Sequence, residues 1–146
     1  MTYSILMLDD DGDDVYLYRQ VFTQLDEHIQ FLSLPGLEDL TQHYPEQGPT
    51  QLPVPSLILL DMNLPKFNGL DIYRFIQQHP RLQKVPTLIL TTSSSPLDMA
   101  DCKAAGIHSY FTKPMDYTEV ISLAQCIHHY WFKHNRLTPL DSTTPA

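Results

Sequence analysis

The sequence Ser56-Leu57-Ile58-Leu59-Leu60-Asp61-Met62-Asn63-Leu64-Pro65-Lys66-Phe67-Asn68-Gly69 decides the fold of this 146-residue chain. Its run of four branched apolar residues predicts a strand buried on both faces, as in the centre of a parallel sheet. The strand ends on a carboxylate, Asp61. Because ligands bind in the crevice outside the carboxyl ends of such strands, Asp61 is a candidate for chemistry. Pro65 and Gly69 then shape a loop that leads into a helix.

Short apolar runs and helical patterns alternate along the rest of the chain. Strands are predicted at 3–8, 29–34, 57–60, 86–90 and 108–112, and helices at 13–25, 37–44, 70–78, 96–105 and 116–131. Five strands, each followed by a helix, predict an α/β fold with right-handed crossovers. We therefore expect a doubly wound, five-stranded parallel sheet with helices on both faces. Residues 45–55 are polar and proline-rich, which predicts a long surface loop.

Composition narrows the class of protein. A chain of this length, with 42% hydrophobic residues, can bury the core of one domain. Its net charge of −8 argues against direct binding to nucleic acid or to an anionic membrane. No signal peptide or membrane-spanning stretch is evident, so we expect a cytoplasmic location. The two cysteines, Cys102 and Cys126, lack the spacing of a zinc site and suggest no disulfide framework.

Polar side chains follow four of the predicted strands: Asp9, Asp10 and Asp11, then Asp61, then Thr91 and Thr92, then Lys113. In a parallel sheet these groups can converge in one crevice. Because the carboxylates repel one another, they need a cation, and an all-oxygen site suits Mg²⁺ or Mn²⁺. Hydroxyls and a lysine beside the metal would complete recognition of an anionic phosphoryl group. The inferred chemistry is phosphoryl transfer to a carboxylate nucleophile.

The same motifs resemble the receiver domain of two-component response regulators. The resemblance rests on the acid pair after the first strand and on the sequences Leu-Leu-Asp-Met-Asn-Leu-Pro, Leu-Thr-Thr-Ser and Tyr-Phe-Thr-Lys-Pro, and it covers about residues 3–132. Within the family, the chain is most similar to stand-alone regulators of the type associated with bacterial phytochromes. This resemblance implies a flavodoxin-like, CheY-like fold with strand order 2-1-3-4-5. The receiver domain would span residues 1–136, and residues 137–146 would form a short tail without an output domain.

The resemblance also implies roles at the site. Asp61 would be both the phosphoacceptor and a Mg²⁺ ligand. Asp10 would be a direct ligand, Asp9 a ligand through water, and Asn63 a ligand through its backbone carbonyl. Lys113 and Thr92 would contact the phosphoryl oxygens. Thr91 would be the switch hydroxyl, and Tyr110 the aromatic residue that follows it inward. The Lys113–Pro114 peptide bond would be cis.

The implied function is that of a single-domain response regulator in a phosphorelay. A sensor histidine kinase or a phosphotransfer protein would donate the phosphoryl group, and Mg²⁺ would assist its transfer to Asp61. The protein would be a signalling domain, not an enzyme, and would catalyse only its own phosphorylation and dephosphorylation. Output would pass through a protein contact or through a homodimer.

Two other classes of function compete with this interpretation. A receiver-like module that binds partners without phosphorylation would be expected to lack part of the acid, threonine and lysine set, yet all of it is present. A Mg²⁺-dependent phosphatase of the haloacid dehalogenase type needs a second aspartate two residues after its nucleophile, where this chain has Asn63. A Rossmann nucleotide site is disfavoured because no G-x-G-x-x-G occurs.

Several residues allow two interpretations. Asp11 could add to metal binding or start the loop, and together with Asp13 and Asp14 it is expected to cap the first helix. Tyr110 could be a switch or a packing residue. Adjacent helical residues point in different directions, so we expect His128 and His129 to be solvated and not to share a metal. The residues left open between core packing and a partner surface are Tyr130, Trp131 and Phe132.

Overall fold

The computed structural model describes residues 2–62, 64, 69–91, 100, 102–107, 110–114 and 116–134. The elements follow in the order β1 (Tyr3–Leu8), α1 (Gly12–Leu25), β2 (Ile29–Leu34), α2 (Leu37–His43), β3 (Leu57–Asp61), α3 (Gly69–Gln78), β4 (Thr87–Thr91), β5 (Tyr110–Thr112), α5 (Tyr117–Ile127) and the π-helix η1 (His128–His134).

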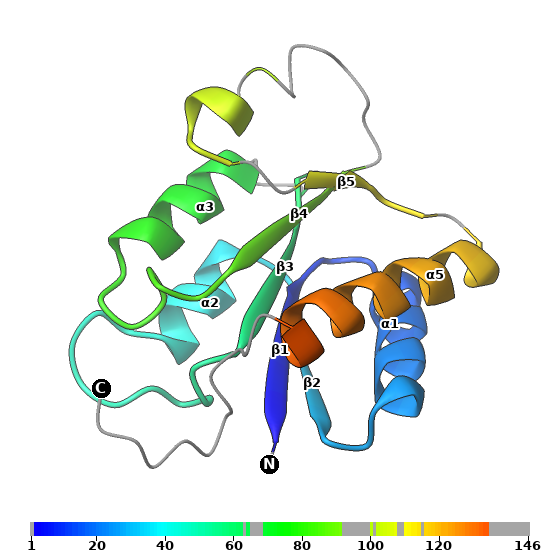
Figure 1. The fold of residues 1–146 in the computed structure, drawn as a ribbon. Coiled ribbons are helices and arrows are strands. Elements are labelled where there is room, and N and C mark those ends of the chain that lie inside the picture. The colour runs from blue at the N-terminus through cyan, green and yellow to red at the C-terminus, as the bar shows by residue number, and fades with distance from the viewer. Residues whose placement is uncertain are drawn as a thin grey trace.

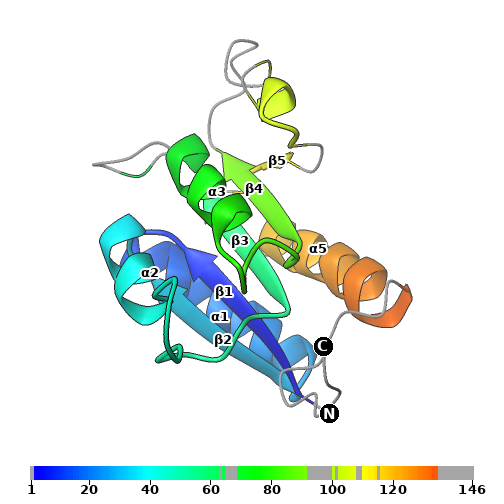
Figure 2. The same cartoon turned by 90° about the vertical axis from the view of Figure 1, so that its left-hand side faces the viewer.

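The strands form one parallel sheet in the order β2-β1-β3-β4-β5. The predicted fold class and strand order are thereby confirmed. Figures 1 and 2 show α1 and α5 side by side on one face of the sheet and α2 and α3 on the other. With helices on both faces, the sheet offers a ligand only its edges and the ends of its strands.

The side chains of the central strands alternate between two hydrophobic cores. On β1, Ile5 and Met7 pack in the core under α1 and α5, whereas Leu6 and Leu8 pack in the core on the opposite face. Residues 57–60 of β3 divide between the two cores in the same way, and all four are fully buried. This alternation explains why both strands are continuous apolar runs.

Two of the helices begin at aspartate caps. The Asp11 carboxylate accepts hydrogen bonds from the backbone N–H groups of Asp13 and Asp14, at 2.9 and 3.2 Å, so the capping interpretation of Asp11 is confirmed. Asp116 caps α5 in the same way and accepts from the Glu119 N–H at 2.8 Å. Both caps lie at the carboxyl edge of the sheet, where they fix the start of helices that flank the candidate site.

The fourth predicted helix is described only in part, at residues 100 and 102–104. Gly106 ends it with φ 88°, as predicted for a C′ glycine. The Ile107 N–H bonds to the Cys102 carbonyl at 2.9 Å, and the Gly106 N–H bonds to the Lys103 carbonyl at 3.0 Å. The predicted tail, residues 137–146, lies outside the described residues.

The aromatic residues at the end of the last helix divide between core and surface. Phe132 is buried and packs on Tyr3, with ring centroids 4.9 Å apart. Trp131 is half-buried against the same core, while Tyr130 is 58% exposed and meets Trp131 edge to face. Core packing therefore accounts for Phe132 and part of Trp131, and Tyr130 is left as a surface residue.

Two expectations from the sequence are wrong. His128 is not solvated, because its Nε2 lies 2.8 Å from Asp26 Oδ2 where the end of α5 meets the end of α1. His129 is exposed, as expected. No cis peptide bond occurs in the described part of the chain, so Lys113–Pro114 is trans, the form that X–Pro bonds also prefer intrinsically.

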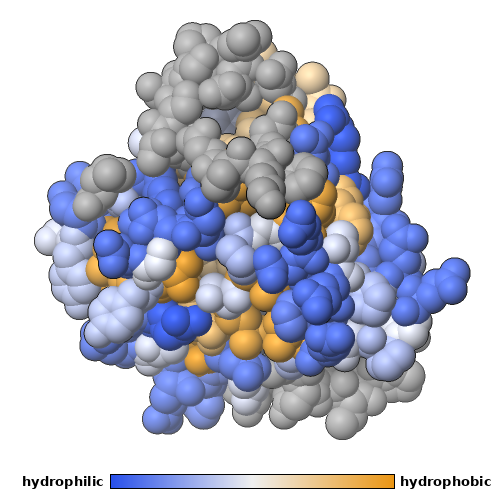
Figure 3. All heavy atoms as spheres, turned by 180° about the vertical axis from the view of Figure 1, so that it is seen from behind, coloured by the Kyte–Doolittle hydropathy of each residue, from blue (hydrophilic) through white to orange (hydrophobic). Residues whose placement is uncertain are grey.

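The surface is mixed in character. Viewed from behind, hydrophilic side chains surround smaller patches of hydrophobic ones (Figure 3). Among the described helices, none has the length and apolar character needed to cross a membrane.

Candidate phosphoryl-acceptor site

The carboxyl ends of three strands bring the candidate site together. Asp9 directly follows β1, Asp61 ends β3, and Lys113 directly follows β5. Since Leu8 pairs with Leu60 across β1 and β3, the two aspartates are delivered to neighbouring positions at the sheet edge. All three residues are buried: counted over the whole residue, 3% of Asp9, 6% of Asp61 and 4% of Lys113 is exposed.

Lys113 holds the site together. Its Nζ lies 2.6 Å from Asp9 Oδ2, 2.7 Å from Asp14 Oδ2 and 3.3 Å from Asp61 Oδ2. An ammonium group has three N–H donors, so these three carboxylates can use all of them. The sequence-based prediction that Asp9, Asp61 and Lys113 converge is correct.

Burial and charge set the protonation of this cluster. Burial works to lower the pKa of Lys113, but the hydrogen bonds to Asp14 and Asp9 outweigh it and raise the pKa above its usual value. The side chain is therefore an ammonium at neutral pH. Burial raises the pKa of Asp9, against the bonds that its carboxylate accepts from Lys113 and from the Asp11 N–H at 2.9 Å. The site thus concentrates negative charge where water cannot screen it.

The acid cluster fits a hard divalent cation. Asp9, Asp10 and Asp61 each offer a carboxylate oxygen, and these oxygens lie within 4.8 Å of one another. Asp10 is exposed, whereas the other two are buried. An all-oxygen set with one open side suits Mg²⁺ or Mn²⁺, which keep water ligands. The fourth predicted ligand, the Asn63 carbonyl, lies outside the described residues.

The predicted switch residues are described only in part. Thr91 ends β4 and its backbone pairs with Thr112, but its side chain, like all of Thr92, lies outside the described residues. Tyr110 is half-buried and packs against the core on the α2 and α3 face. Its packing is compatible with either of the two roles that the sequence allowed.

Sequence reasoning missed Asp14. It treated this residue as a helix-capping acid, yet its carboxylate contacts Lys113, 99 positions further along the chain. One feature of the sequence indicates that the Asp14 side chain can face the sheet. Asp14 precedes the buried Val15 and lies one helical turn before the buried Tyr18. A charged residue bordering the apolar stripe of a helix can face the sheet.

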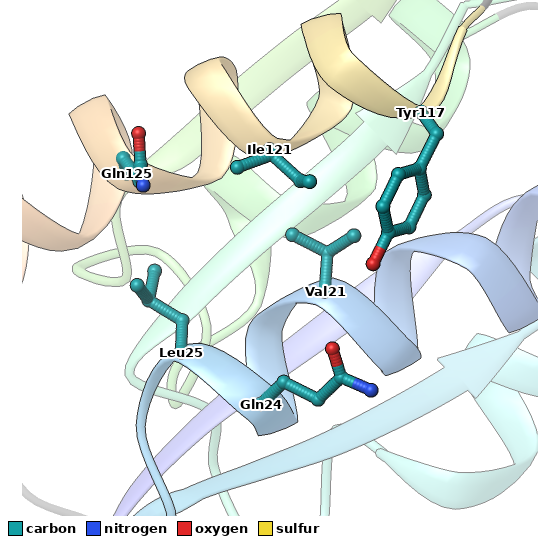
Figure 4. Close-up of a pocket in the computed structure, with 6 residues that line it drawn as sticks. All are labelled: Val21, Gln24, Leu25, Tyr117, Ile121 and Gln125. Atoms are coloured by element: carbon teal, nitrogen blue, oxygen red, sulfur yellow. The ribbon is translucent and has the colours of Figure 1, made fainter.

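A hollow in the surface lies away from the acid cluster. Figure 4 shows it between α1 and α5, with a volume of about 180 Å³, and it is lined by Val21, Gln24, Leu25, Tyr117, Ile121 and Gln125. None of these side chains is a carboxylate or an amine. The acid cluster at the sheet edge is therefore the better candidate for phosphoryl chemistry.

The fold and the site together define a class: a doubly wound α/β domain with carboxylates and a lysine at the carboxyl edge of its sheet, an arrangement suited to accepting a phosphoryl group. Comparison with known sequences makes the class specific. The family model described as "Response regulator receiver domain" matches residues 5–125, and the chain belongs to this family.

Individual relatives agree with this assignment. Response regulator Rcp1 of Synechocystis sp. is 29% identical over 130 residues, which cover 88% of each chain. The probable methanogenesis regulatory protein FilR2 of Methanothrix harundinacea is 30% identical over 138 residues, covering 92% of this chain and 86% of that protein.

Solved structures share the fold. The Mn²⁺-bound form of Rcp1 has a TM-score of 0.77 at 27% identity and covers 99% of both chains. The phosphorylated cyanobacterial phytochrome response regulator RcpA has a TM-score of 0.83 at 22% identity and covers 94% of this chain and 99% of that one. The resemblance to response regulators such as Rcp1 is thus confirmed, and the chain is a signalling domain of the two-component class.

Proposed function

We propose that the chain is a phosphorylation switch in which Asp61 is the phosphoacceptor. A sensor histidine kinase or a phosphotransfer protein supplies the phosphoryl group. The observation that carries the proposal is the buried contact of Lys113 with Asp9 and Asp61 at the end of neighbouring strands. A lysine held between two carboxylates at a ligand-binding edge is placed to receive an anionic group on one of them.

The transfer needs little chemistry from the protein beyond position and charge. An oxygen of Asp61 attacks phosphorus, the bond from phosphorus to the donor imidazole breaks, and the electron pair leaves with the imidazole. Lys113 donates an N–H to a phosphoryl oxygen and balances its charge. We also assign to Thr92 a contact with that group. Hydrolysis of the acyl phosphate at the same site would reset the switch.

Mg²⁺ or Mn²⁺ is the cofactor of this proposal. Asp9, Asp10, Asp61 and the backbone carbonyl of Asn63 would hold it, and it would neutralise charge on the phosphoryl oxygens. The close approach of three carboxylate oxygens supports this assignment, as does the similarity of the chain to the Mn²⁺-bound form of Rcp1.

Output would pass through the surface around β5 and α5. We propose that Thr91 bonds the phosphoryl group and that Tyr110 moves with it, which shifts the equilibrium of this surface. Phe111 on β5 and Tyr117 at the start of α5 are 37% and 51% exposed, as a protein-binding surface requires. The partner that binds this surface would be a downstream protein or a second copy of this chain, since the net charge of −8 disfavours binding to nucleic acid and to anionic membranes.

The proposal extends to the boundaries and the location of the domain. Residues 1–136 would form the receiver domain, and residues 137–146 a tail that takes no part in phosphorylation. A kinase donor that draws on ATP would place the protein in the cytoplasm.

The test is the mass of the intact protein after incubation with acetyl phosphate, with and without Mg²⁺. Wild type should gain one phosphoryl group only with Mg²⁺, and Asp61→Asn should gain none. Asp13→Asn, which removes an exposed acid near the site, is the matched control and should be phosphorylated like wild type. Size-exclusion chromatography of the phosphorylated protein then tests dimer formation.

Two results would contradict the proposal. A wild type that gains no phosphoryl group from acetyl phosphate or from any kinase would favour the phosphorylation-independent binding module. Turnover of added phosphate esters without a stable adduct would favour the aspartyl phosphatase instead.

A further inference from the structure

The contact between Asp14 and Lys113 points to a role that the family assignment does not include. We propose that Asp14 is a positioning residue that holds the Lys113 ammonium in the unphosphorylated protein and releases it when Asp61 carries a phosphoryl group. This inference rests on the proposed function and adds a residue that tunes it.

A phosphoryl group on Asp61 has to compete with the present carboxylate partners of Lys113 for its N–H donors. The lysine Nζ lies within hydrogen-bond or ion-pair distance of carboxylates on Asp9, Asp14 and Asp61, at 2.6, 2.7 and 3.3 Å. These acceptors can occupy all three N–H donors of the ammonium. A phosphoryl oxygen on Asp61 needs one of the donors, so one of the present contacts has to weaken.

The contact with Asp14 is the one that can be released at least cost. The side chains of Asp9 and Asp61 are 0% and 8% exposed, whereas that of Asp14 is 36% exposed. Water can therefore hydrate the Asp14 carboxylate after the lysine leaves, but it reaches the other two poorly. Asp9 and Asp61 also belong to the acid cluster that fits the metal, and Asp14 does not.

The fold holds Asp14 in place for this role. It lies in the first turn of α1, and its backbone N–H donates to the Asp11 cap at 3.2 Å. One turn further along the same helix, Tyr18 is only 1% exposed. The Asp11 cap before Asp14 and the buried Tyr18 after it fix this part of the helix, so the position of the Asp14 carboxylate follows from the backbone.

Loss of the Asp14 charge has opposite effects on two steps. Without it, the ammonium turns fully to Asp9 and Asp61, where it competes with a divalent cation, so Mg²⁺ binds more weakly. Once Mg²⁺ is saturating, the lysine is freer to bond the incoming group. The step itself is unchanged: Asp61 oxygen bonds phosphorus while the bond from phosphorus to the acetyl oxygen breaks, and acetate leaves with the electron pair.

The experiment compares Asp14→Ala with Asp13→Ala. Both remove an acid from the first turn of α1, so both lose the same favourable interaction with the helix dipole, but only Asp14 contacts Lys113 in the described structure. Mg²⁺ affinity is measured by calorimetry without phosphodonor, and phosphorylation by acetyl phosphate is timed at saturating Mg²⁺. Asp14→Glu tests rescue, and thermal denaturation confirms that each variant folds.

In Asp14→Ala, the Mg²⁺ dissociation constant should rise about three- to tenfold, the order expected for loss of one hydrogen bond whose charge is partly screened by solvent. Phosphorylation at saturating Mg²⁺ should become about two- to fivefold faster. Asp13→Ala should change neither quantity more than about twofold, and Asp14→Glu should restore both toward wild type. Equal behaviour of the two alanine variants, or a slower reaction in Asp14→Ala, would overturn the role of Asp14. A wild type that binds Mg²⁺ but never gains a phosphoryl group would instead refute the function on which the role depends.

Discussion

At the scale of single residues, Gly69 shows how closely the chain packs beside the proposed phosphoacceptor. A Cβ on Gly69 would lie 2.5 Å from Met62 Sδ and 2.8 Å from Met62 Cα, and the Gly69 N–H donates to the Met62 carbonyl at 3.0 Å. A side chain there would push against the backbone next to Asp61. A positive φ is not the reason for a glycine at this position, because Gly69 does not have one. The reason is the close approach of Met62.

We expect Gly69→Ala to lower the free energy of unfolding by about 1–3 kcal/mol, because the new methyl group forces the strand end and the helix start apart. It should also slow phosphorylation of Asp61. Urea denaturation and the mass assay measure the two effects. Gly12→Ala is the control: no atom lies within 4 Å of its added Cβ, so its stability should be unchanged or slightly higher. Equal stability of the two variants would contradict the packing argument.

Residues also differ in how far the sequence predicts their roles. Asp61 is predictable because an apolar run delivers it to the sheet edge. Asp14 is harder, because its contact with Lys113 depends on how α1 packs beside the end of β5. The cis prediction for Lys113–Pro114 came from the family resemblance alone and was wrong.

At the scale of elements, His79 joins the loop after α2 to the end of α3. Its ring is fully buried, and Nε2 lies 2.9 Å from the Tyr44 carbonyl oxygen while Nδ1 accepts the Arg81 N–H at 3.1 Å. A carbonyl can only accept, so the proton is on Nε2. The Arg81 guanidinium donates to the carbonyls of Pro45 and Gly48 in the same loop. The loop is thus fixed by side chains of a distant turn.

We expect His79→Ala to reduce the free energy of unfolding by about 2–4 kcal/mol, because it leaves a cavity and buried groups without hydrogen-bond partners. Chemical denaturation measures the change. His28→Ala, which removes an exposed ring, should cost less than about 0.5 kcal/mol. A loss at His79 no larger than at His28 would mean that the loop does not depend on this histidine.

The ends of α1 and α5 are joined by the pair of Asp26 and His128. Burial works to raise the pKa of Asp26, but bonds from the His128 ring and the His28 N–H outweigh it and lower the pKa. A folded-state pKa below the unfolded value adds stability above the unfolded pKa. That stability is lost as pH falls through the folded pKa.

Wild type should therefore lose more stability than Asp26→Asn when the pH falls from about 5 to about 3, since the ordinary aspartate pKa is near 4. The difference should be below about 1 kcal/mol, because the carboxylate is partly exposed to solvent. Denaturation curves over this pH range test it. Glu27→Gln, an exposed neighbour, should follow the pH profile of wild type; parallel profiles for all three proteins would exclude a contribution from the pair.

Elements are the level at which the sequence was most informative. The strand 29–34 was predicted with its observed bounds, and α1 begins one residue before its predicted start. The π-helical turn at His128–His134 was not predicted. The apolar residues before it, Val120, Ala124, Ile127 and Trp131, recur at intervals of four, three and four residues, which suits an ordinary helix. The pair of Asp26 and His128 was missed for a related reason: it joins residues 102 positions apart, and periodicity carries no information on such contacts.

At the scale of the whole molecule, the sheet separates two apolar cores on its faces from a cluster of charged groups at one edge. The cores lie on the two faces of the sheet, while the carboxylates of Asp9, Asp10 and Asp61 share one edge with the ammonium of Lys113, which also contacts Asp14. The negative charge of the cluster is thus only partly balanced. A chain with net charge −8 has no surplus of positive charge to supply the rest. Folding should therefore be linked to binding of a divalent cation.

Mg²⁺ should raise the thermal midpoint of unfolding. At a concentration one hundred times the dissociation constant, binding to the folded state alone stabilises by about 2.7 kcal/mol, which corresponds to roughly 5–11 °C for a domain of this size. Sodium chloride at equal ionic strength separates specific binding from general screening and should give a much smaller rise. Asp61→Asn removes one charge of the cluster and should reduce the Mg²⁺ effect, whereas Asp13→Asn should keep it. If sodium chloride raised the midpoint as much as Mg²⁺ did, screening of the net charge would explain the effect and the acid cluster would not be a metal site.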